Sequence, residues 1–270
     1  MKKNRLMSIF LMLPMSVVLI LAGVCVRAQS VYGEYATRDG LRLLEIGKAL
    51  AKVPETGARP EDYVPPHWTI TDRAEGDLNG DGIEDFAFTL MLDEKDAKYI
   101  ESLKQLSPDA SWIDQTFIIV VIDSRGDRKL HLNTINYNLY GDAETPARNG
   151  DARDEFKLSM KQNVLSVKIE YGGSLRSSAT FLFREEKPTG GDLLLIGFEY
   201  ASFCVTPSND CPGWRMSENY LTNTRVETNY RLQGARTVGA NKQTQIASVK
   251  VEFMDARLNE RNKKGDMRPF

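Results

Sequence analysis

The chain has 270 residues and a net charge of −2, with 41% hydrophobic and 27% charged residues. This length supports one substantial hydrophobic core or two small ones. The composition is that of a globular protein and too hydrophobic for a disordered one. The first 28 residues hold four cationic side chains and no acidic ones, so without them the net charge is −6. This balance argues against a nucleic-acid binder, which normally carries a basic domain or stripe.

Residues 1–28 are typical of an export signal. A cationic start precedes the apolar run Leu6–Val24, and Val26-Arg27-Ala28 then supplies the residues that a signal peptidase needs before its cut. We therefore expect cleavage after Ala28 and a periplasmic or secreted protein with no stable membrane span. Two alternatives stay open: the run is long enough to remain as a membrane anchor, or Cys25 carries a lipid.

Two cysteines follow the signal segment, Cys204 and Cys211. In an oxidising compartment this even number predicts a disulfide that closes a short loop rich in turn-forming residues. The alternatives are two free thiols or a metal pair, although no histidine stands nearby to complete a zinc site. A loop this small gains modest stability from closure, so the bridge is expected to fix the shape of the loop.

Residues 29–67 are predicted as a helical segment followed by a proline-rich connector. Leu43, Ile46, Leu50 and Val53 fall on one stripe of a helix that starts at Asp39 and is ended by proline. Four prolines over residues 54–67 predict an extended connector that separates this helix from the main body.

Residues 68–256 are predicted as a β-rich domain, because the hydrophobic pattern from Trp68 onward has a period of two. The expected strands cover residues 86–92, 116–123, 130–134, 165–171, 180–184, 193–200, 225–232 and 246–253. One further helix is predicted at Glu94–Leu106. Short strands joined by tight turns predict a mainly β fold with an antiparallel sheet body, as a sandwich, an open barrel or a partial propeller. The polar tail 257–270 is expected to be flexible.

One segment carries a metal-binding pattern: residues 76–86 read Gly-Asp-Leu-Asn-Gly-Asp-Gly-Ile-Glu-Asp-Phe. Asp77, Asn79, Asp81 and Asp85 stand at positions 1, 3, 5 and 9 of a calcium loop, and Ile83 at position 7 offers its backbone carbonyl. Calcium prefers six to eight hard oxygen ligands, and alternate residues of a tightly curled loop direct such oxygens at one centre. The segment therefore predicts a Ca²⁺ site.

The surroundings of this loop differ from those of an EF-hand. Position 12 is Phe88 instead of the bidentate glutamate, and it lies inside a predicted strand. The sequence therefore predicts a calcium loop at the tip of a β-hairpin, with modest affinity and a structural role for the ion. The alternative is an acidic turn without an ion.

The segment 76–86 resembles the FG-GAP-type repeat, which is also found in VCBS-type bacterial surface proteins and integrin propellers. In that family such a loop joins two strands of a blade and binds calcium, which implies Asp77, Asn79, Asp81 and Asp85 as side-chain ligands and Ile83 as a carbonyl ligand. The resemblance covers only about residues 68–92, and a whole propeller needs several such repeats.

A second, looser resemblance involves residues 171–176, 180–184, 195–198 and 219–222. These segments are similar to ordered segments of exported bacterial proteins that pair one such loop with a β-rich C-terminal half. That similarity implies an architecture and a compartment, and it supplies no reaction. The chain departs from the usual pattern at Asn223, where glycine is the common residue.

Other motifs are weaker guides to function. Arg125-Gly126-Asp127 spells an integrin-binding tripeptide, but it stands between two predicted strands, where glycine and aspartate are ordinary turn residues. The only histidines, His67 and His131, are far apart in the sequence, which makes a catalytic triad or a histidine-based zinc site an unfavoured reading.

Three tryptophans bear on a binding role. Trp68, Trp112 and Trp214 each stand near a turn or connector, where an exposed ring can stack on a sugar or anchor a partner. The alternative is a ring that covers the edge of the core.

Taken together, these features predict an exported, calcium-stabilised, non-enzymatic module that binds an envelope component or a glycan. The alternative is a carbohydrate or cell-wall hydrolase with paired carboxylates, which are recognised by a separation in space that one sequence does not give. A third hypothesis is adhesion through Arg125-Gly126-Asp127.

Overall fold

The computed structural model describes residues 40–106, 113, 116–139, 155–171, 175–186, 191–204, 213–233, 236–248 and 250–256. The predicted signal segment 1–28, Cys25, Trp112, Cys211 and residues 257–270 lie outside these residues, so the predictions made for them stay predictions. Within the described residues no helix is both long enough and apolar enough to span a membrane.

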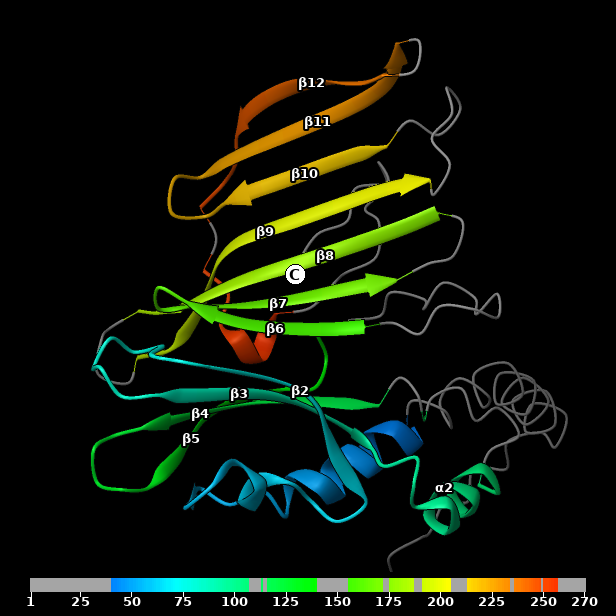
Figure 1. Cartoon of the computed structure of the whole chain (residues 1–270), viewed down its shortest axis with the longest axis vertical. Coiled ribbons are helices and arrows are strands. Elements are labelled where there is room, and N and C mark those ends of the chain that lie inside the picture. The colour runs from blue at the N-terminus through cyan, green and yellow to red at the C-terminus, as the bar shows by residue number, and fades with distance from the viewer. Residues whose placement is uncertain are drawn as a thin grey trace, which may run out of the picture.

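Two antiparallel sheets make up most of the molecule (Figure 1). The first has the strand order β1-β5-β4-β3-β2. Its strands are β1 (Thr56–Gly57), β2 (Trp68–Gly76), β3 (Asp85–Leu92), β4 (Phe117–Ser124) and β5 (Leu130–Asn136). The second is a meander with the order β12-β11-β10-β9-β8-β7-β6. Its strands are β6 (Glu155–Lys161), β7 (Val164–Tyr171), β8 (Leu175–Glu185), β9 (Leu193–Cys204), β10 (Trp214–Asn219), β11 (Thr224–Gln233) and β12 (Arg236–Gln245).

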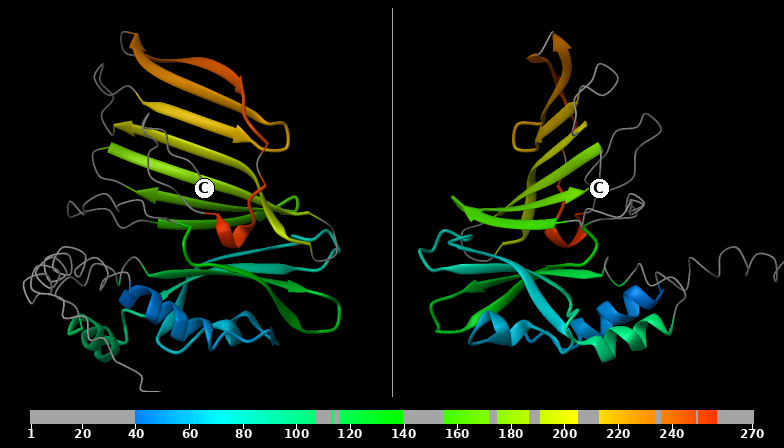
Figure 2. Two further views of the ribbon diagram at one scale, coloured as in Figure 1. Left: turned by 180° about the vertical axis from the view of Figure 1, so that it is seen from behind. Right: turned by 45° about the vertical axis from the view of Figure 1, so that its right-hand side comes forward.

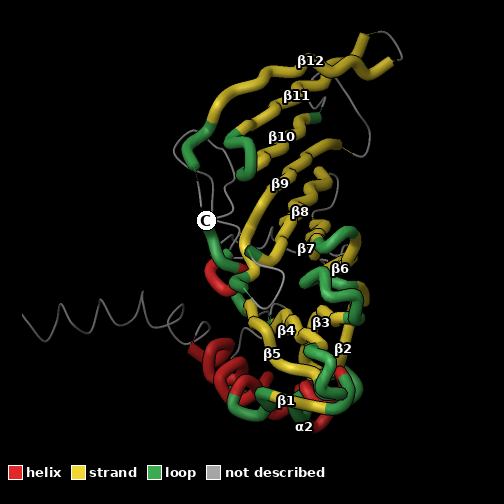
Figure 3. Tube along the Cα trace, turned by 90° about the vertical axis from the view of Figure 1, so that its left-hand side faces the viewer, coloured by secondary structure: helices red, strands yellow, loops and turns green. Residues whose placement is uncertain are grey.

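Helices cover the face of the first sheet that points away from the second, as the side view in Figure 3 shows. They are a helix over residues 40–50, the 3-10 turn η1 (Pro60–Tyr63) and α2 (Ala97–Lys104). Ile46 from the first helix and Leu103 from α2 pack with Phe88 and Val120 of the sheet. The two views in Figure 2 show the resulting order of layers: helices, five-stranded sheet, seven-stranded sheet.

Strand β4 explains why residues 116–123 form a continuous apolar run. Alternate residues face different layers: Val120 belongs to the core beside the helices, whereas Ile119 belongs to the core between the two sheets. All eight residues of the strand are buried. A strand buried on both faces loses the alternation of polar and apolar residues that marks a strand with one solvent face.

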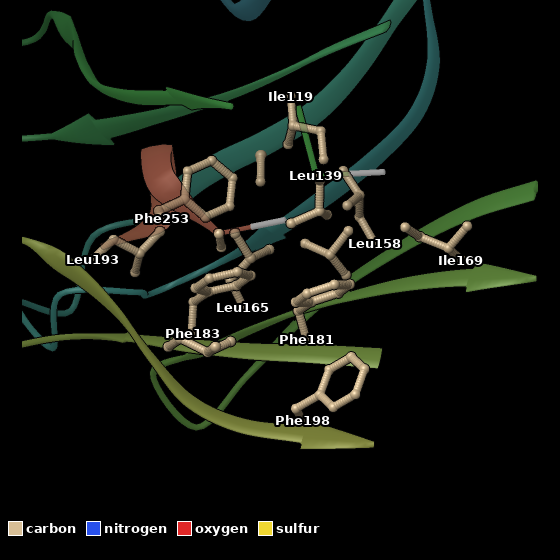
Figure 4. Close-up of a cluster of buried hydrophobic side chains, with 14 of the residues drawn as sticks. Ile119, Leu139, Leu158, Leu165, Ile169, Phe181, Phe183, Leu193, Phe198 and Phe253 are labelled. Carbon is tan, nitrogen blue, oxygen red and sulfur yellow. The ribbon is translucent and has the colours of Figure 1, made fainter. Parts of the chain in front are cut away.

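The core between the sheets is formed largely by aromatic and branched side chains (Figure 4). The ring centres of Phe181 and Phe198 in the seven-stranded sheet lie 5.1 Å apart. The ring of Phe183 packs edge to face on that of Phe253, with 4.8 Å between the ring centres. Phe253 comes from the short turn η3 (Phe253–Asp255), which the chain reaches after β12. Asn136 holds that turn by donating from Nδ2 to the carbonyl of Phe253 at 2.5 Å.

The prediction of a mainly β, antiparallel body is confirmed, and the two sheets pack as a sandwich. The described strands close no barrel. Both predicted helices are present, as are the predicted strands from residue 86 to residue 232.

The predicted strand at residues 246–253 is wrong. Its apolar residues serve the core instead of a ladder: Phe253 is 1% exposed, and a single bridge joins Leu194 to Glu252. The last strand is β12, which the sequence did not predict. The side chains of residues 238–245 are partly or fully exposed, so no burial imposes a hydrophobic period there.

The proline-rich connector also differs from its prediction, because it packs into the body instead of separating the first helix from it. Tyr63 is fully buried, and its hydroxyl donates to the carbonyl of Leu130 at 2.5 Å. Thr56 and Gly57 pair with β5. The prolines predicted an extended connector, but they could not show that its first residues pair with β5 and that Tyr63 packs into the core.

Candidate calcium site

The predicted calcium loop joins β2 to β3 and lies at the tip of their hairpin, as expected. The strands pair in antiparallel register up to Gly76 and Asp85, and residues 77–84 form the loop between them. Leu78 is 1% exposed and belongs to the core between the sheets, whereas residues 80–84 are exposed. The loop is therefore anchored at one side and open to solvent at the other.

The side-chain oxygens of Asp77, Asn79 and Asp81 are ordered by backbone donors of the loop itself. Oδ1 of Asp77 accepts from the N–H groups of Gly80 at 2.6 Å and Asp81 at 3.1 Å, and Oδ2 accepts from Gly82 at 2.9 Å. Oδ1 of Asn79 accepts from the same Asp81 N–H at 2.9 Å. Because one donor serves oxygens of two side chains, the loop curls around a group of oxygen atoms.

Asp85 is held differently from the other predicted ligands. It is fully buried; Oδ2 accepts from the N–H groups of Leu78 at 2.8 Å and Asn79 at 3.3 Å, and Oδ1 accepts from Ser124 at 2.9 Å. Burial is the main cause that raises the pKa of Asp85, and these three hydrogen bonds oppose that rise. Asp85 thus links the start of the loop to the end of β4 through hydrogen bonds. Sequence spacing alone missed this role, because Ser124 is distant in the chain.

Two glycines make the tight curl possible. Gly80 and Gly82 have φ angles of 81° and 82°, in the left-handed region that favours glycine. A methyl group on Gly80 would lie 3.1 Å from Nδ2 of Asn163, in the turn between β6 and β7. A methyl group on Gly126 would lie 3.6 Å from Cδ1 of Ile83. The loop therefore touches one turn from each sheet.

The residues of the loop fit calcium in the chemistry of their donors. Asp77, Asn79 and Asp81 offer hard carboxylate and amide oxygens, and Ile83 offers a carbonyl, which are the groups that Ca²⁺ prefers. Among the described residues, no three side chains of the His, Cys, Asp and Glu types are grouped closely enough to hold a metal ion by themselves. A site here accordingly depends on the amide and carbonyl oxygens as well as on the two carboxylates.

One hollow lies between the predicted calcium loop and the turn that joins β4 to β5, and another lies near η3. One, of about 280 Å³, lies beside the loop and is lined by Ile83, Arg128 and Lys129 among others. The other, of about 230 Å³, lies between β5, the start of β9 and η3, and its carboxylates are Asp192 and Glu252.

The five buried carboxylates of the described residues each have a structural partner. Glu45 pairs with Lys48, Asp123 with Arg125, and Glu218 with Arg225, while Glu185 accepts from Asn133 and Asp85 from backbone donors. A catalytic acid and base need to face a substrate. These carboxylates instead hold neighbouring side chains and turns in place.

The two histidines are placed apart, each beside its own aspartate. Nδ1 of His67 lies 2.7 Å from Asp96, and the His67 ring stacks on Tyr99. Nε2 of His131 lies 3.0 Å from Asp127. Each histidine is thus engaged with a different aspartate in the structure.

Asp127 belongs to the Arg125-Gly126-Asp127 tripeptide, which occupies the turn between β4 and β5. Nε of Arg125 lies 3.1 Å from Asp123, and Asp127 accepts from the N–H of Lys129 at 3.0 Å. Both charged side chains of the tripeptide therefore have partners within or next to the turn. This agrees with the interpretation of the tripeptide as ordinary turn residues.

The remaining predicted site residues lie near the ends of strands. Cys204 ends β9, and because Cys211 lies outside the described residues, the disulfide between them stays a prediction. Trp68 is 7% exposed and packs in the core beside the helices, so it has the structural role that we gave as the alternative. Trp214 is half-buried, with its ring centre 5.4 Å from that of Tyr200.

Comparisons with protein-family models, with curated proteins and with solved structures found no match. Any functional conclusion therefore depends on the geometry of the molecule.

Proposed function

We propose that this chain is an exported, calcium-stabilised β-rich module that binds a component of the cell envelope and catalyses no reaction. The observation that carries this proposal is the ordered loop 77–84. Its curl gathers the oxygens of Asp77, Asn79 and Asp81 at the place where both sheets meet. The resemblance to an FG-GAP-type hairpin supports the same conclusion.

Calcium would be held by the side chains of Asp77, Asn79 and Asp81 and by the carbonyl of Ile83. Asp85 would keep the loop against β4. When bound, the ion supplies positive charge that offsets the repulsion between the acidic side chains. Since Leu78 is embedded in the core between the sheets and Gly80 touches the turn at Asn163, stiffening the loop also stiffens the joint between the sheets.

A binding role is supported over a hydrolytic one by the placement of the acidic and basic side chains. Every buried carboxylate of the described residues is engaged with a partner, and the two histidines lie apart, each beside its own aspartate. By contrast, the seven-stranded sheet presents one broad face to solvent. A rigid scaffold with an open face is suited to recognition of an extended ligand.

The calcium part of this proposal is tested by thermal unfolding of the purified protein, with about 1 mM calcium and with chelator, in the concentration range of extracellular modules. Calcium should raise the unfolding midpoint, because an ion that binds only the folded state stabilises it by mass action. Asp81→Ala should abolish this rise. Glu84→Gln, a change to an exposed acidic residue of the same loop that is no predicted ligand, should keep it.

The binding part is tested by passing the tagged protein over purified sacculi, outer-membrane fragments and soluble envelope extract. Retention on at least one of these fractions is expected. Failure on all three, by a protein whose midpoint responds to calcium, would contradict the binding function and leave the calcium site standing.

A further inference from the structure

From β6 to β10 the seven-stranded sheet has one covered face and one open face, whereas the described side chains of β11 and β12 reach solvent on both faces. Figure 1 views the sheet face on, and in the left view of Figure 2 the chain after β12 passes across the sheet toward η3. The covered face carries Phe181, Phe198 and Met216, which are fully buried. On the other face, from β7 to β12, Gly197 is the one described residue that is buried. The remaining described side chains of that face reach solvent.

An aromatic row crosses the open face where β9, β10, β11 and β12 lie next to one another. Phe203 follows Ser202, which pairs with Trp214, so Phe203 stands beside Gly213. On the other side of Gly213, the N–H of Tyr230 donates to its carbonyl at 3.1 Å, and Tyr230 pairs with Gly239 in β12. The row therefore reads Phe203, Gly213, Tyr230, Gly239 across four neighbouring segments.

The two glycines form a low floor between and beside the rings. A methyl group on Gly213 would lie 3.5 Å from Cβ of Phe203 and 3.6 Å from Cδ2 of Tyr230. A methyl group on Gly239 would lie 3.1 Å from Cε1 of Tyr230. The ring of Tyr230 thus extends over positions that lack side chains, and Phe203 is 47% exposed. The result is an aromatic surface with one exposed ring, Phe203, and one half-buried ring, Tyr230.

Polar and charged groups flank this surface, among them the exposed Arg176 of β8, which pairs with Phe203. Nη2 of Arg215 lies 3.0 Å from Glu199, so their charges offset each other. Thr228 pairs directly with Arg215 on the neighbouring strand, and its Oγ1 donates to Oδ1 of Asn241 at 2.9 Å. These groups retain further hydrogen-bonding capacity toward solvent, since Arg has five N–H donors and the amide of asparagine has two.

The chemistry of this surface selects its occupant. Nucleic acid and anionic membranes are recognised by clusters of uncompensated Lys and Arg, whereas here Arg215 is paired with Glu199 and Arg176 adds a single further cation beside Phe203. A stable protein partner requires a larger apolar centre than two rings provide. A neutral sugar has a flat face of C–H groups and a rim of hydroxyls, which match an exposed and a half-buried ring bordered by the paired Arg215 and Glu199 and by the amide of Asn241.

We propose that the open face of β9–β12 binds a neutral polysaccharide, with Phe203 and Tyr230 as the stacking surface and with Arg215, Glu199 and Asn241 as partners of sugar hydroxyls. This inference rests on the proposed binding function and names its ligand class and its site. The rings contact the sugar faces, and the polar side chains determine the orientation of the chain of sugars.

The test is depletion of the purified protein from solution by insoluble cellulose, chitin and purified sacculi. Phe203→Ala and Tyr230→Ala should each weaken binding about tenfold, as expected for loss of one desolvated aromatic contact. Tyr230→Phe, which keeps the ring over the glycines, should bind nearly as well as the wild type. Leu221→Ala, at a 57% exposed position outside the row, is the matched control and should bind normally.

The outcomes separate this inference from the function on which it rests. If the wild type binds none of the three polymers but is retained by another envelope fraction, the polysaccharide site is refuted and the binding function stands. If a polymer binds and Phe203→Ala binds equally well, the location is refuted. If sedimentation shows a wild-type dimer that Phe203→Ala abolishes, the face is a contact between copies of the chain and the proposal fails. Circular dichroism and the unfolding midpoint show whether each variant folds.

Discussion

Replacing Asp85 tests the idea that this residue ties the hairpin loop to the sheet. Its two oxygens accept three backbone hydrogen bonds, from Leu78, Asn79 and Ser124, in a fully buried environment. Asp85→Ala removes every acceptor at once and leaves the three N–H groups without partners. The change also removes a carboxylate that burial disfavours, and the raised pKa of Asp85 shows the direction of that effect.

The net effect follows from the difference between these two contributions. A buried donor without an acceptor costs about 1–3 kcal/mol. Because removal of the buried charge offsets part of this loss, we expect Asp85→Ala to lower the free energy of unfolding by about 3 kcal/mol. Asp85→Asn keeps one acceptor oxygen but turns an NH₂ group toward a backbone donor, so about half of that loss is expected.

Urea unfolding followed by tryptophan fluorescence measures this change, since Trp68 is buried in the core of the same sheet. The loss should be the same with calcium and with chelator, because the three hydrogen bonds need no ion. Glu84→Ala, at the exposed neighbouring position, is the control and should change stability little. A loss under about 0.5 kcal/mol in Asp85→Ala would refute the tying role. A loss seen only with calcium would make Asp85 a calcium ligand instead.

The pH dependence of the wild-type stability follows from the sign of the pKa shift of Asp85. The folded protein holds the Asp85 proton to a higher pH than the unfolded chain does, so the folded state binds more protons in the window above 3.8. Stability from this group is therefore greatest below that window and falls as the pH rises through it. Asp85→Asn should remove this slope, which is read from the difference between the wild-type and variant unfolding curves.

Three further predictions concern sites away from Asp85. Arg225→Ala should lower the free energy of unfolding in urea by about 3 kcal/mol. The change leaves the carboxylate of Glu218, whose side chain is 3% exposed, without its cationic partner. A loss below about 1 kcal/mol would contradict this. Gly80→Ala should destabilise by about 1–2 kcal/mol through its positive φ, whereas Gly47→Ala, in a helix with nothing within 4 Å, should stabilise by about 0.5–1 kcal/mol; equal effects would refute the strain argument. The pKa of Asp96 is lowered, chiefly by its histidine partner, so its contribution is present above 3.8 and is lost as the pH falls through the lowered value. Asp96→Asn should flatten that part of the curve of melting temperature against pH, and an unchanged curve would count against the ion pair.

The sequence was informative where burial imposes a period. Residues 165–171 alternate because Leu165, Val167 and Ile169 are fully buried while the residues between them reach solvent. The hydrophobic pattern of the sequence was misleading where a segment is apolar without forming a strand, or forms a strand without being buried. The segment 246–253, which ends at Phe253, is apolar because it packs against the core between the sheets. Strand β12 is polar because its described side chains reach solvent. Hydrophobic pattern reports burial, and it reports strands where burial alternates or where, as in β4, every residue of a short run is buried.

The candidate site shows the same division within one hairpin. The spacing of Asp77, Asn79 and Asp81 and the position of Gly82 predict the curl of the loop, since these depend on neighbours in the chain. The sequence could not show that the loop contacts a turn from each sheet, nor that Asp85 reaches Ser124 across 39 positions. It also could not show that Phe203 and Tyr230 flank Gly213 on one open face.

By itself the sequence determined the mainly β class, the hairpin and the chemistry of its loop, because local geometry and the period of burial are written in adjacent residues. The tertiary structure alone decided which strands neighbour one another, which face of the long sheet stays open, and what each buried carboxylate contacts. Strand pairing joins residues that are distant in the chain, so no local pattern encodes it.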